Sequence, residues 1–274
     1  MPDPGGSRTR LKEALARPAS RRPGPGLTVL VYHRVGGGTP DERDITTAAF
    51  TAQVDELARH RVVDLDTALD ELEAGDDSPK VAITFDDGFA DVADPVLPIL
   101  VERALPFTLY LATAYVGGEM HWEGSTATGP GPALSWDQVG ALVDSGLATI
   151  GNHTHDHARP EQLDEAQLDR CSAVIRDRTG SVPLHFAYPW GIVVPRCEPA
   201  LRARFRSAAT GSVGRHCAGD DPLQMRRVPV RGSDPIEFFR AKLTGRLLPE
   251  RAYGVVVAGA KRLGARPARP RDSR

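Results

Sequence analysis

Short apolar runs alternate along the chain with longer segments in which apolar residues recur every three or four positions. Runs of the first kind, typical of buried strands, include residues 27–32, 80–85 and 107–113. The longer segments have the period of an amphipathic helix, seen at Phe50, Val54 and Leu57, and at Val139, Leu142 and Val143. Ser135 precedes the second of these and is expected to cap it.

This repeated strand–helix pattern predicts a parallel sheet of about seven strands, since parallel strands need long crossover connections. The sheet could be open and doubly wound or closed as a barrel. No GxGxxG follows a strand, which favours a barrel over a nucleotide-binding open sheet. No linker is visible inside residues 27–262, which are expected to form one domain. Residues 1–26 and 263–274 are rich in Pro, Gly and Arg and are expected to be flexible tails.

Composition and charge narrow the class of protein. The chain has 274 residues, of which 41% are hydrophobic, enough for a sizeable core. Its 34 Lys and Arg are balanced by 36 Asp and Glu, so nucleic acid is not an expected partner. The three cysteines lack CxxC spacing and are expected to be free thiols. No stretch reads as a signal peptide or a transmembrane segment, which leads us to expect a cytoplasmic protein.

Three polar clusters follow apolar strands: FDDG at 85–88, HTHDH at 153–157 and YPWG at 188–191. The carboxyl ends of parallel strands meet at one edge of a sheet or one mouth of a barrel, where active sites form. The three clusters are therefore expected to lie together.

The first two clusters can hold a catalytic metal. His153 and His157 are four residues apart, which would place both imidazoles on one side of a helical turn and point His155 elsewhere. With one carboxylate of the Asp86–Asp87 pair they would bind a divalent transition metal and leave positions open. The other carboxylate would stay free to take a proton from the attacking water. This combination predicts hydrolysis, although an isolated HxxxH is equally often a solvated loop or a core pair.

The motifs TFDDG, HTHDH and FAYPWG, in this order, resemble the first three motifs of the polysaccharide deacetylases, the NodB-homology or carbohydrate esterase family 4 group. The similarity extends to VLVYHRV and to LSWDQVGALVDSGLATIGNHT, and it covers roughly residues 27–230. It implies a single domain with a distorted (β/α)7 barrel, in agreement with the strand–helix alternation.

The resemblance also implies roles for individual residues. Asp86 would be the general base, and the ligands of a divalent metal, Zn, Co or Ni, would be Asp87, His153 and His157. Thr154 would support the first histidine. The Trp190 backbone N–H would stabilise the oxyanion. The substrate-binding residues would be His33, Tyr188, Pro189, Trp190 and Gly191.

Two positions depart from the family pattern. Many members carry an arginine two residues before the proline of the third motif, where this chain has Ala187. The late Leu-x-His motif that supplies a general acid is also absent, and the last histidine is His216. We expect Asp86 to return the proton to the leaving amine and His216 to be dispensable.

The sequence thus predicts a metal-dependent hydrolase that removes an N-acetyl group from an acetamido sugar, a glycoconjugate precursor or a glycoside. Without an export signal, its expected substrates are nucleotide-linked, lipid-linked or small-molecule glycosides. Hydrolysis of a formamido sugar or a cyclic amide is an alternative, as is a catalytically weak sugar-binding homologue, which a turnover assay would distinguish. An iron oxygenase with two histidines and one carboxylate is disfavoured, because such enzymes are normally all-β.

Overall fold

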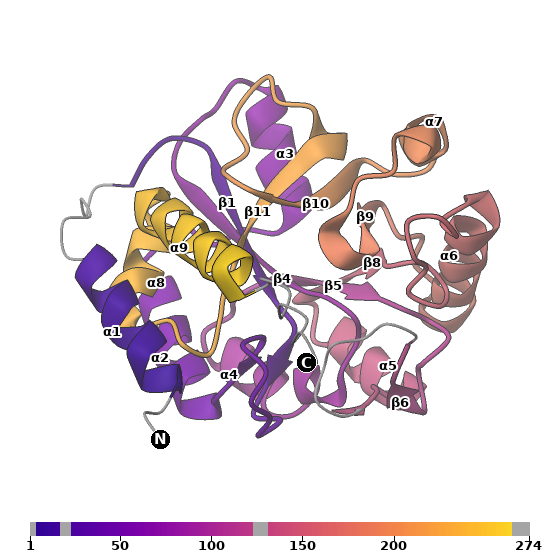
Figure 1. Cartoon of the computed structure of the whole chain (residues 1–274). Helices are drawn as coiled ribbons and strands as arrows, with labels where there is room; N and C mark the ends of the chain where they lie inside the picture. The colour runs from indigo at the N-terminus through magenta and orange to yellow at the C-terminus, as the bar shows by residue number, and fades with distance from the viewer. Residues whose placement is uncertain (1–3, 17–22, 123–130, 265–274) are drawn as a thin grey trace, which may run out of the picture.

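The computed structural model describes residues 4–16, 23–122 and 131–264. Within these ranges seven parallel strands close into a barrel in the order β1-β11-β10-β9-β8-β5-β4, and β4 pairs back with β1 (Figure 1). The barrel strands are β1 (Leu27–Tyr32), β4 (Lys80–Phe85), β5 (Phe107–Leu111), β8 (Ala148–Asn152), β9 (His185–Ala187), β10 (Ser207–Val213) and β11 (Met225–Pro229). The predicted (β/α)7 barrel is confirmed.

Helices surround the barrel (Figure 1). They are α2 (Thr47–Leu57), α3 (Leu65–Glu73), α4 (Val96–Glu102), α5 (Trp136–Asp144), α6 (Glu165–Thr179), α7 (Glu198–Arg202), α8 (Ile236–Leu243) and α9 (Leu248–Gly264). Short strands pair outside the barrel, β2 (Arg34–Val35) with β3 (Asp44–Ile45), and β6 (Glu119–Met120) with β7 (Gly131–Pro132). Single 3₁₀ turns lie at Ala90–Val92, Pro189–Gly191, Pro195–Cys197 and Pro222–Gln224. The predicted cap of α5 is confirmed, since the Ser135 hydroxyl accepts from the Gln138 amide in a capping box.

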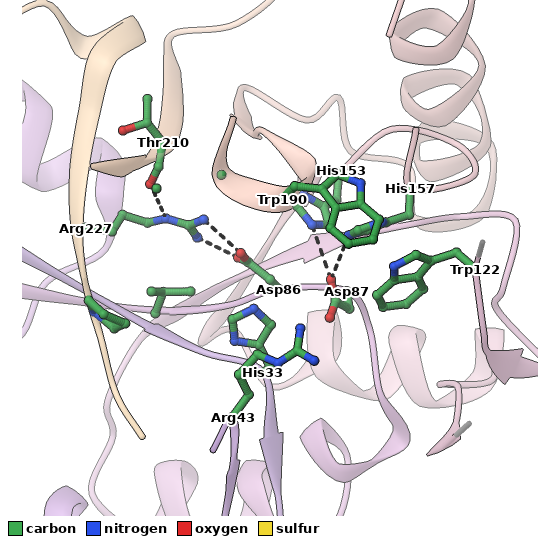
Figure 2. A pocket seen from close by; sticks show the side chains of 14 residues that line it. His33, Arg43, Asp86, Asp87, Trp122, His153, His157, Trp190, Thr210 and Arg227 are labelled. Carbon is green, nitrogen blue, oxygen red and sulfur yellow. Dashed lines mark hydrogen bonds and ion pairs between the residues drawn. The ribbon is translucent and has the colours of Figure 1, made fainter. Parts of the chain in front are cut away.

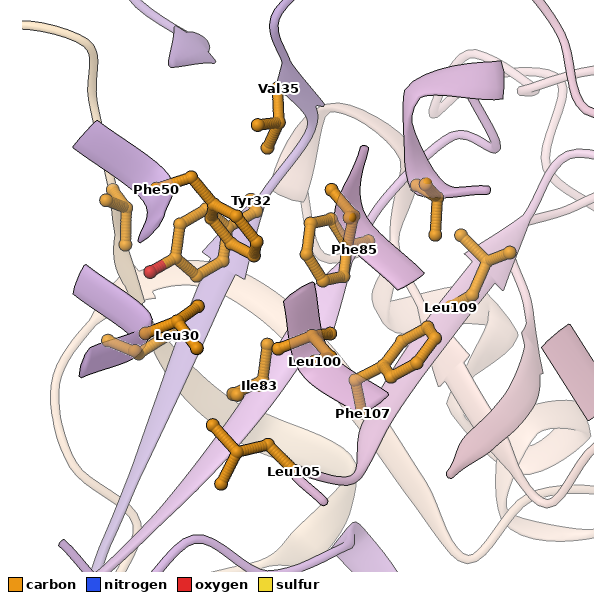
Figure 3. Packing of buried hydrophobic residues seen from close by; sticks show 14 of the residues in the cluster. Leu30, Tyr32, Val35, Phe50, Ile83, Phe85, Leu100, Leu105, Phe107 and Leu109 are labelled. Carbon is orange, nitrogen blue, oxygen red and sulfur yellow. The ribbon is translucent and has the colours of Figure 1, made fainter. Parts of the chain in front are cut away.

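A cluster of aromatic rings packs between the barrel and its helices (Figure 3). The Tyr32 ring stacks on Phe85 at 5.3 Å between centroids and meets the edge of Phe50 at 5.5 Å. Phe85 also meets Phe107 at 5.8 Å. These contacts hold the carboxyl ends of β1 and β4 rigidly, so the residues that follow those two strands start from fixed positions.

The segment expected to be an N-terminal tail contains a packed helix, α1 (Pro4–Ala16), which contacts α8 and α9. The Lys12 side chain is fully buried, with its ammonium 2.7 Å from an Asp234 carboxylate oxygen and 4.4 Å from the Tyr253 ring centroid. The packed helix over residues 4–16 differs from the flexible tail expected over 1–26. The sequence did not indicate this packing, because Asp234, the charge partner of Lys12, is distant in sequence. Most of the expected C-terminal tail, residues 265–274, lies outside the described residues. None of the helices in the described part is long and apolar enough to cross a bilayer.

Candidate active site

A cavity of about 290 Å³ opens at the carboxyl ends of the barrel strands (Figure 2). Side chains that follow β1, β4, β8 and β9 line it, among them His33, Asp86, Asp87, His153, His157 and Trp190. The three polar clusters of the sequence therefore meet at one mouth of the barrel, as expected.

Asp87 faces two imidazoles inside this cavity. Its Oδ1 lies 3.3 Å from His153 Nε2 and 3.4 Å from His157 Nε2, and all three residues are buried. In a tetrahedral zinc site with bonds of about 2.0–2.1 Å, neighbouring ligand atoms are about 3.3 Å apart. The spacing of the three donors therefore fits a divalent transition metal, and within the described residues they form a possible metal-binding group.

The DDG turn after β4 separates the two aspartates. The Asp86 amide still donates to the Tyr32 carbonyl at 3.0 Å, whereas Asp87 has a φ of 78° and Gly88 a φ of 110°. A Cβ on Gly88 would collide with the Leu111 side chain. Only glycine fits this close turn, which directs the two adjacent carboxylates to different partners.

The histidine segment differs from the helical turn expected from its spacing. Residues 153–157 form a loop in which Thr154 and His157 have φ values of 63° and 55°, in the left-handed region. The Thr154 hydroxyl accepts from the Ala158 amide at 2.8 Å, and its own amide donates to the Asn152 side chain at 2.8 Å. This buried threonine thus supports the loop that brings the two imidazoles together.

The remaining ring nitrogens show how the loop orients its histidines. His153 Nδ1 lies 2.8 Å from the Ala187 carbonyl oxygen, which can only accept, so Nδ1 carries the proton and Nε2 is free to ligate. His155 points away, with Nδ1 2.8 Å from the Thr113 hydroxyl, as expected.

Arg227 in β11 is a site residue that the sequence analysis missed. Its guanidinium donates to both Asp86 oxygens, at 2.6 and 2.8 Å, and its Nε donates to the Thr210 carbonyl at 3.2 Å. Burial opposes ionisation of Asp86, but Arg227 and His153 outweigh it and hold its pKa below the usual 3.8. The available signal was an arginine inside the strand MRRVP, where Arg226 is exposed and Arg227 is buried. Many relatives carry an arginine at the position of Ala187. In this chain the arginine that contacts the Asp86 carboxylate is Arg227.

Comparison with known proteins finds a similar family and similar solved structures. The polysaccharide deacetylase family model matches residues 73–203, which include both aspartates, the two histidines that face Asp87 and the Pro-Trp-Gly turn. The solved structure of IcaB from Ammonifex degensii is 27% identical, covers 83% of this chain and 100% of its own, and superposes with a TM-score of 0.68. The chain is similar to the polysaccharide deacetylases in its family-model match, its barrel and the residues at the mouth of that barrel.

Other solved deacetylases share the fold at lower identity. A polysaccharide deacetylase from Bacillus cereus is 22% identical over 80% of this chain and 69% of its own, with a TM-score of 0.67. The Streptococcus pyogenes deacetylase PplD, solved in complex with acetate, is 19% identical over 80% of this chain and 99% of its own, with a TM-score of 0.66. A search of curated proteins found no match.

The third family motif forms one wall of the cavity. Trp190, with a φ of 63° and 37% exposed, and Gly191 line it. Tyr188 and Pro189, also expected to bind substrate, are buried and do not line the cavity. Tyr188 packs on Phe186 instead, and burial raises its pKa to about 12.

His33 follows β1 and lines the cavity. Burial lowers the pKa of its imidazole, and the nearby carboxylates of Asp87 and Asp86 oppose this shift only in part. The ring is therefore neutral at pH 7, with one nitrogen that can donate a hydrogen bond to a substrate hydroxyl and one that can accept a hydrogen bond from it.

His216 lies at the opposite end of the barrel. Its backbone pairs with Leu27, the first residue of β1, whereas Asp86 pairs with Tyr32, the last residue of that strand. At about 3.3 Å per residue, the two ends are roughly 16 Å apart. His216 cannot reach the proposed reaction centre.

We expect His216→Ala to leave kcat and KM of this deacetylase unchanged, because the side chain is remote from the cavity. Steady-state acetate release compared with the wild type measures this. A fall in kcat of about 10²-fold or more, the size expected for a lost general acid, would contradict this placement.

Proposed function

We propose that this chain is a metal-dependent N-deacetylase that hydrolyses the acetamido group of a neutral sugar, and that residues 27–262 form its catalytic domain. The observation that carries the proposal is the separation of two adjacent carboxylates. Asp87 faces two imidazoles, and Asp86 faces a guanidinium. One carboxylate is thus placed to ligate a metal and the other to handle a proton.

Asp87, His153 and His157 would hold the metal ion, with Zn²⁺, Co²⁺ or Ni²⁺ suiting these donors. When bound, such an ion polarises a carbonyl and makes water a stronger nucleophile at neutral pH. The chain itself supplies the remaining groups, and each can be assigned from its contacts.

Asp86 would accept a proton from the attacking water. Arg227 uses one lone pair on each carboxylate oxygen and leaves others free, so Asp86 can be held in place and still act as an acceptor. Arg227 also keeps Asp86 ionised across the neutral range. Because the sequence lacks the late Leu-x-His motif, Asp86 would return the proton to the leaving amine.

Trp190 would stabilise the negative charge that forms on the carbonyl oxygen. Its backbone N–H has no hydrogen-bond acceptor among the described residues, while the next amide, of Gly191, donates to the Tyr188 carbonyl at 3.0 Å. A free N–H at the cavity wall is the type of donor that an oxyanion needs. The exposed part of the Trp190 ring gives a sugar a flat surface to stack on.

The charges in the cavity favour a neutral substrate. Both arginines that line it are paired, Arg43 with Asp41 at 2.6 Å and Arg227 with Asp86 at 2.6 Å. A phosphate-bearing sugar would have to compete with these carboxylates for its cationic contacts. The proposed substrate is therefore an N-acetylated sugar unit without a phosphate in the cavity.

Metal analysis of wild type and His153→Ala, together with acetate release from a panel of N-acetylated sugars, tests this function. We expect equimolar metal and turnover in the wild type, and the loss of both in the variant. The control is His155→Ala, which removes a histidine of the same loop that points to Thr113. Full metal occupancy in His153→Ala would refute the ligand assignment. Release of formate but not acetate would indicate a formamido substrate, and metal binding without turnover would indicate a sugar-binding homologue.

A further inference from the structure

The two imidazoles that face Asp87 are held by different means. His153 has the Ala187 carbonyl 2.8 Å from its Nδ1. The Nδ1 of His157 is buried and has no hydrogen-bond partner among the described residues. A metal-ligating histidine normally donates its second N–H to a carboxylate, a carbonyl or water, and that bond fixes the ring. His157 must be oriented in another way.

Trp122 provides a surface for the His157 ring. The indole and imidazole centroids are 4.0 Å apart, with 28° between the ring planes. Trp190 approaches the same imidazole with its centroid at 5.2 Å and an interplanar angle of 66°. Figure 2 shows the Trp190 ring above Asp87 and the Trp122 ring to the right of Asp87. The imidazole is therefore confined by aromatic rings and not by a hydrogen bond.

Trp122 is itself well fixed. It is only 7% exposed and packs in a cluster with Phe89, Met120 and Ala133, with the Tyr115 ring at 5.9 Å. This cluster touches both segments that carry the ligands. Phe89 follows the DDG turn directly, and the Tyr115 hydroxyl donates to the Asp156 carbonyl at 2.9 Å.

Only the faces of the two rings interact. The indole Nε1 of Trp122 is also buried and has no hydrogen-bond partner in the described structure, so it does not bond to His157 Nδ1. If stacking alone orients the His157 imidazole, an aromatic ring without an N–H should orient it equally well.

We propose that Trp122 is a positioning residue for the metal ligand His157, whose Nε2 it keeps directed at Asp87 by stacking. The inference rests on the proposed metal-dependent function and names a residue outside the three sequence motifs. Without the indole face, the imidazole can rotate in the space that is left. Metal binding would then have to reorder it, and the affinity would fall.

The test is the affinity of metal-free protein for Zn²⁺, measured by competition with a chromophoric chelator. Loss of a group that orients a metal ligand typically weakens binding about 10 to 100-fold, and we expect this for Trp122→Leu. Trp122→Phe keeps a ring face and is expected to stay within about threefold of wild type. The matched control is Trp136→Leu, which removes a tryptophan that contacts Arg178 away from the cavity. The absorption spectrum of bound Co²⁺ gives a second readout of ligand geometry.

Wild-type affinity in Trp122→Leu would overturn the inference, and so would a Phe variant as weak as the Leu variant. If circular dichroism shows that Trp122→Leu does not fold, Trp122→Met replaces it, because methionine fills much of the volume without a ring. Failure of the proposed function looks different: wild type would not bind Zn²⁺, or His153→Ala would bind it equally well.

Discussion

Asp86→Asn is expected to lower kcat by about 10² to 10⁴-fold while the protein keeps its metal. Asparagine preserves the shape of the side chain but cannot accept the proton of the attacking water. The three proposed metal donors are untouched by the change. Acetate release measures kcat, and elemental analysis of the same preparation measures the metal.

Asp87→Asn is the matched comparison, since it makes the same chemical change one residue away. We expect it to lose metal as well as activity, because Asp87 faces both histidines. A thermal melt of each variant separates catalytic loss from unfolding. If Asp86→Asn retains kcat within about threefold of wild type, below the range for a lost general base, Asp86 is not that base.

Arg227→Met is expected to lower the free energy of unfolding by about 3–5 kcal/mol at pH 7, the usual cost of leaving one partner of a buried ion pair alone. Both side chains are about 5% exposed, so little water is available to replace the guanidinium on Asp86. Urea unfolding of the metal-free proteins measures the difference.

The pH dependence follows from the direction of the Asp86 pKa shift. Arg227 helps hold that pKa below 3.8, so the pair stabilises the fold fully above pH 3.8 and loses this effect as pH falls through the lowered pKa. The difference between wild type and Arg227→Met should therefore shrink at acid pH. The double variant Asp86→Asn/Arg227→Met removes both charges and should recover part of the lost stability. A loss below about 1 kcal/mol in Arg227→Met, as for an exposed pair, would contradict the buried pairing.

Local patterns were sufficient to predict the barrel and the three motifs. Alternating strand and helix periods are properties of short segments, and DDG, HTHDH and YPWG each directly follow a strand. The path of the histidine loop could not be read from spacing, because a separation of four residues fits a helical turn as well as a loop. The left-handed conformations of Thr154 and His157 depend on contacts with Asn152, Ala158 and the rings around them.

The missed residues depend on tertiary contacts. Lys12 is polar in sequence yet fully buried, because Asp234 meets its ammonium from the other end of the chain. Trp122 lies in no motif, and its stack on His157 is visible only when the segments after β5 and β8 come together. Arg227 pairs with a carboxylate 141 residues earlier, a contact that no local pattern encodes.

The position of Arg227 also has a consequence for how the protein is made. Asp86 follows β4 and Arg227 belongs to β11, and β1 lies between these two strands in the closed sheet. A chain emerging from the ribosome would carry Asp86 long before its guanidinium partner is synthesised. Contacts this distant in sequence form slowly, since a long loop must close first. The proposed base becomes charge-paired only when β11 docks beside β1, so barrel closure during biosynthesis would also be the moment at which activity begins.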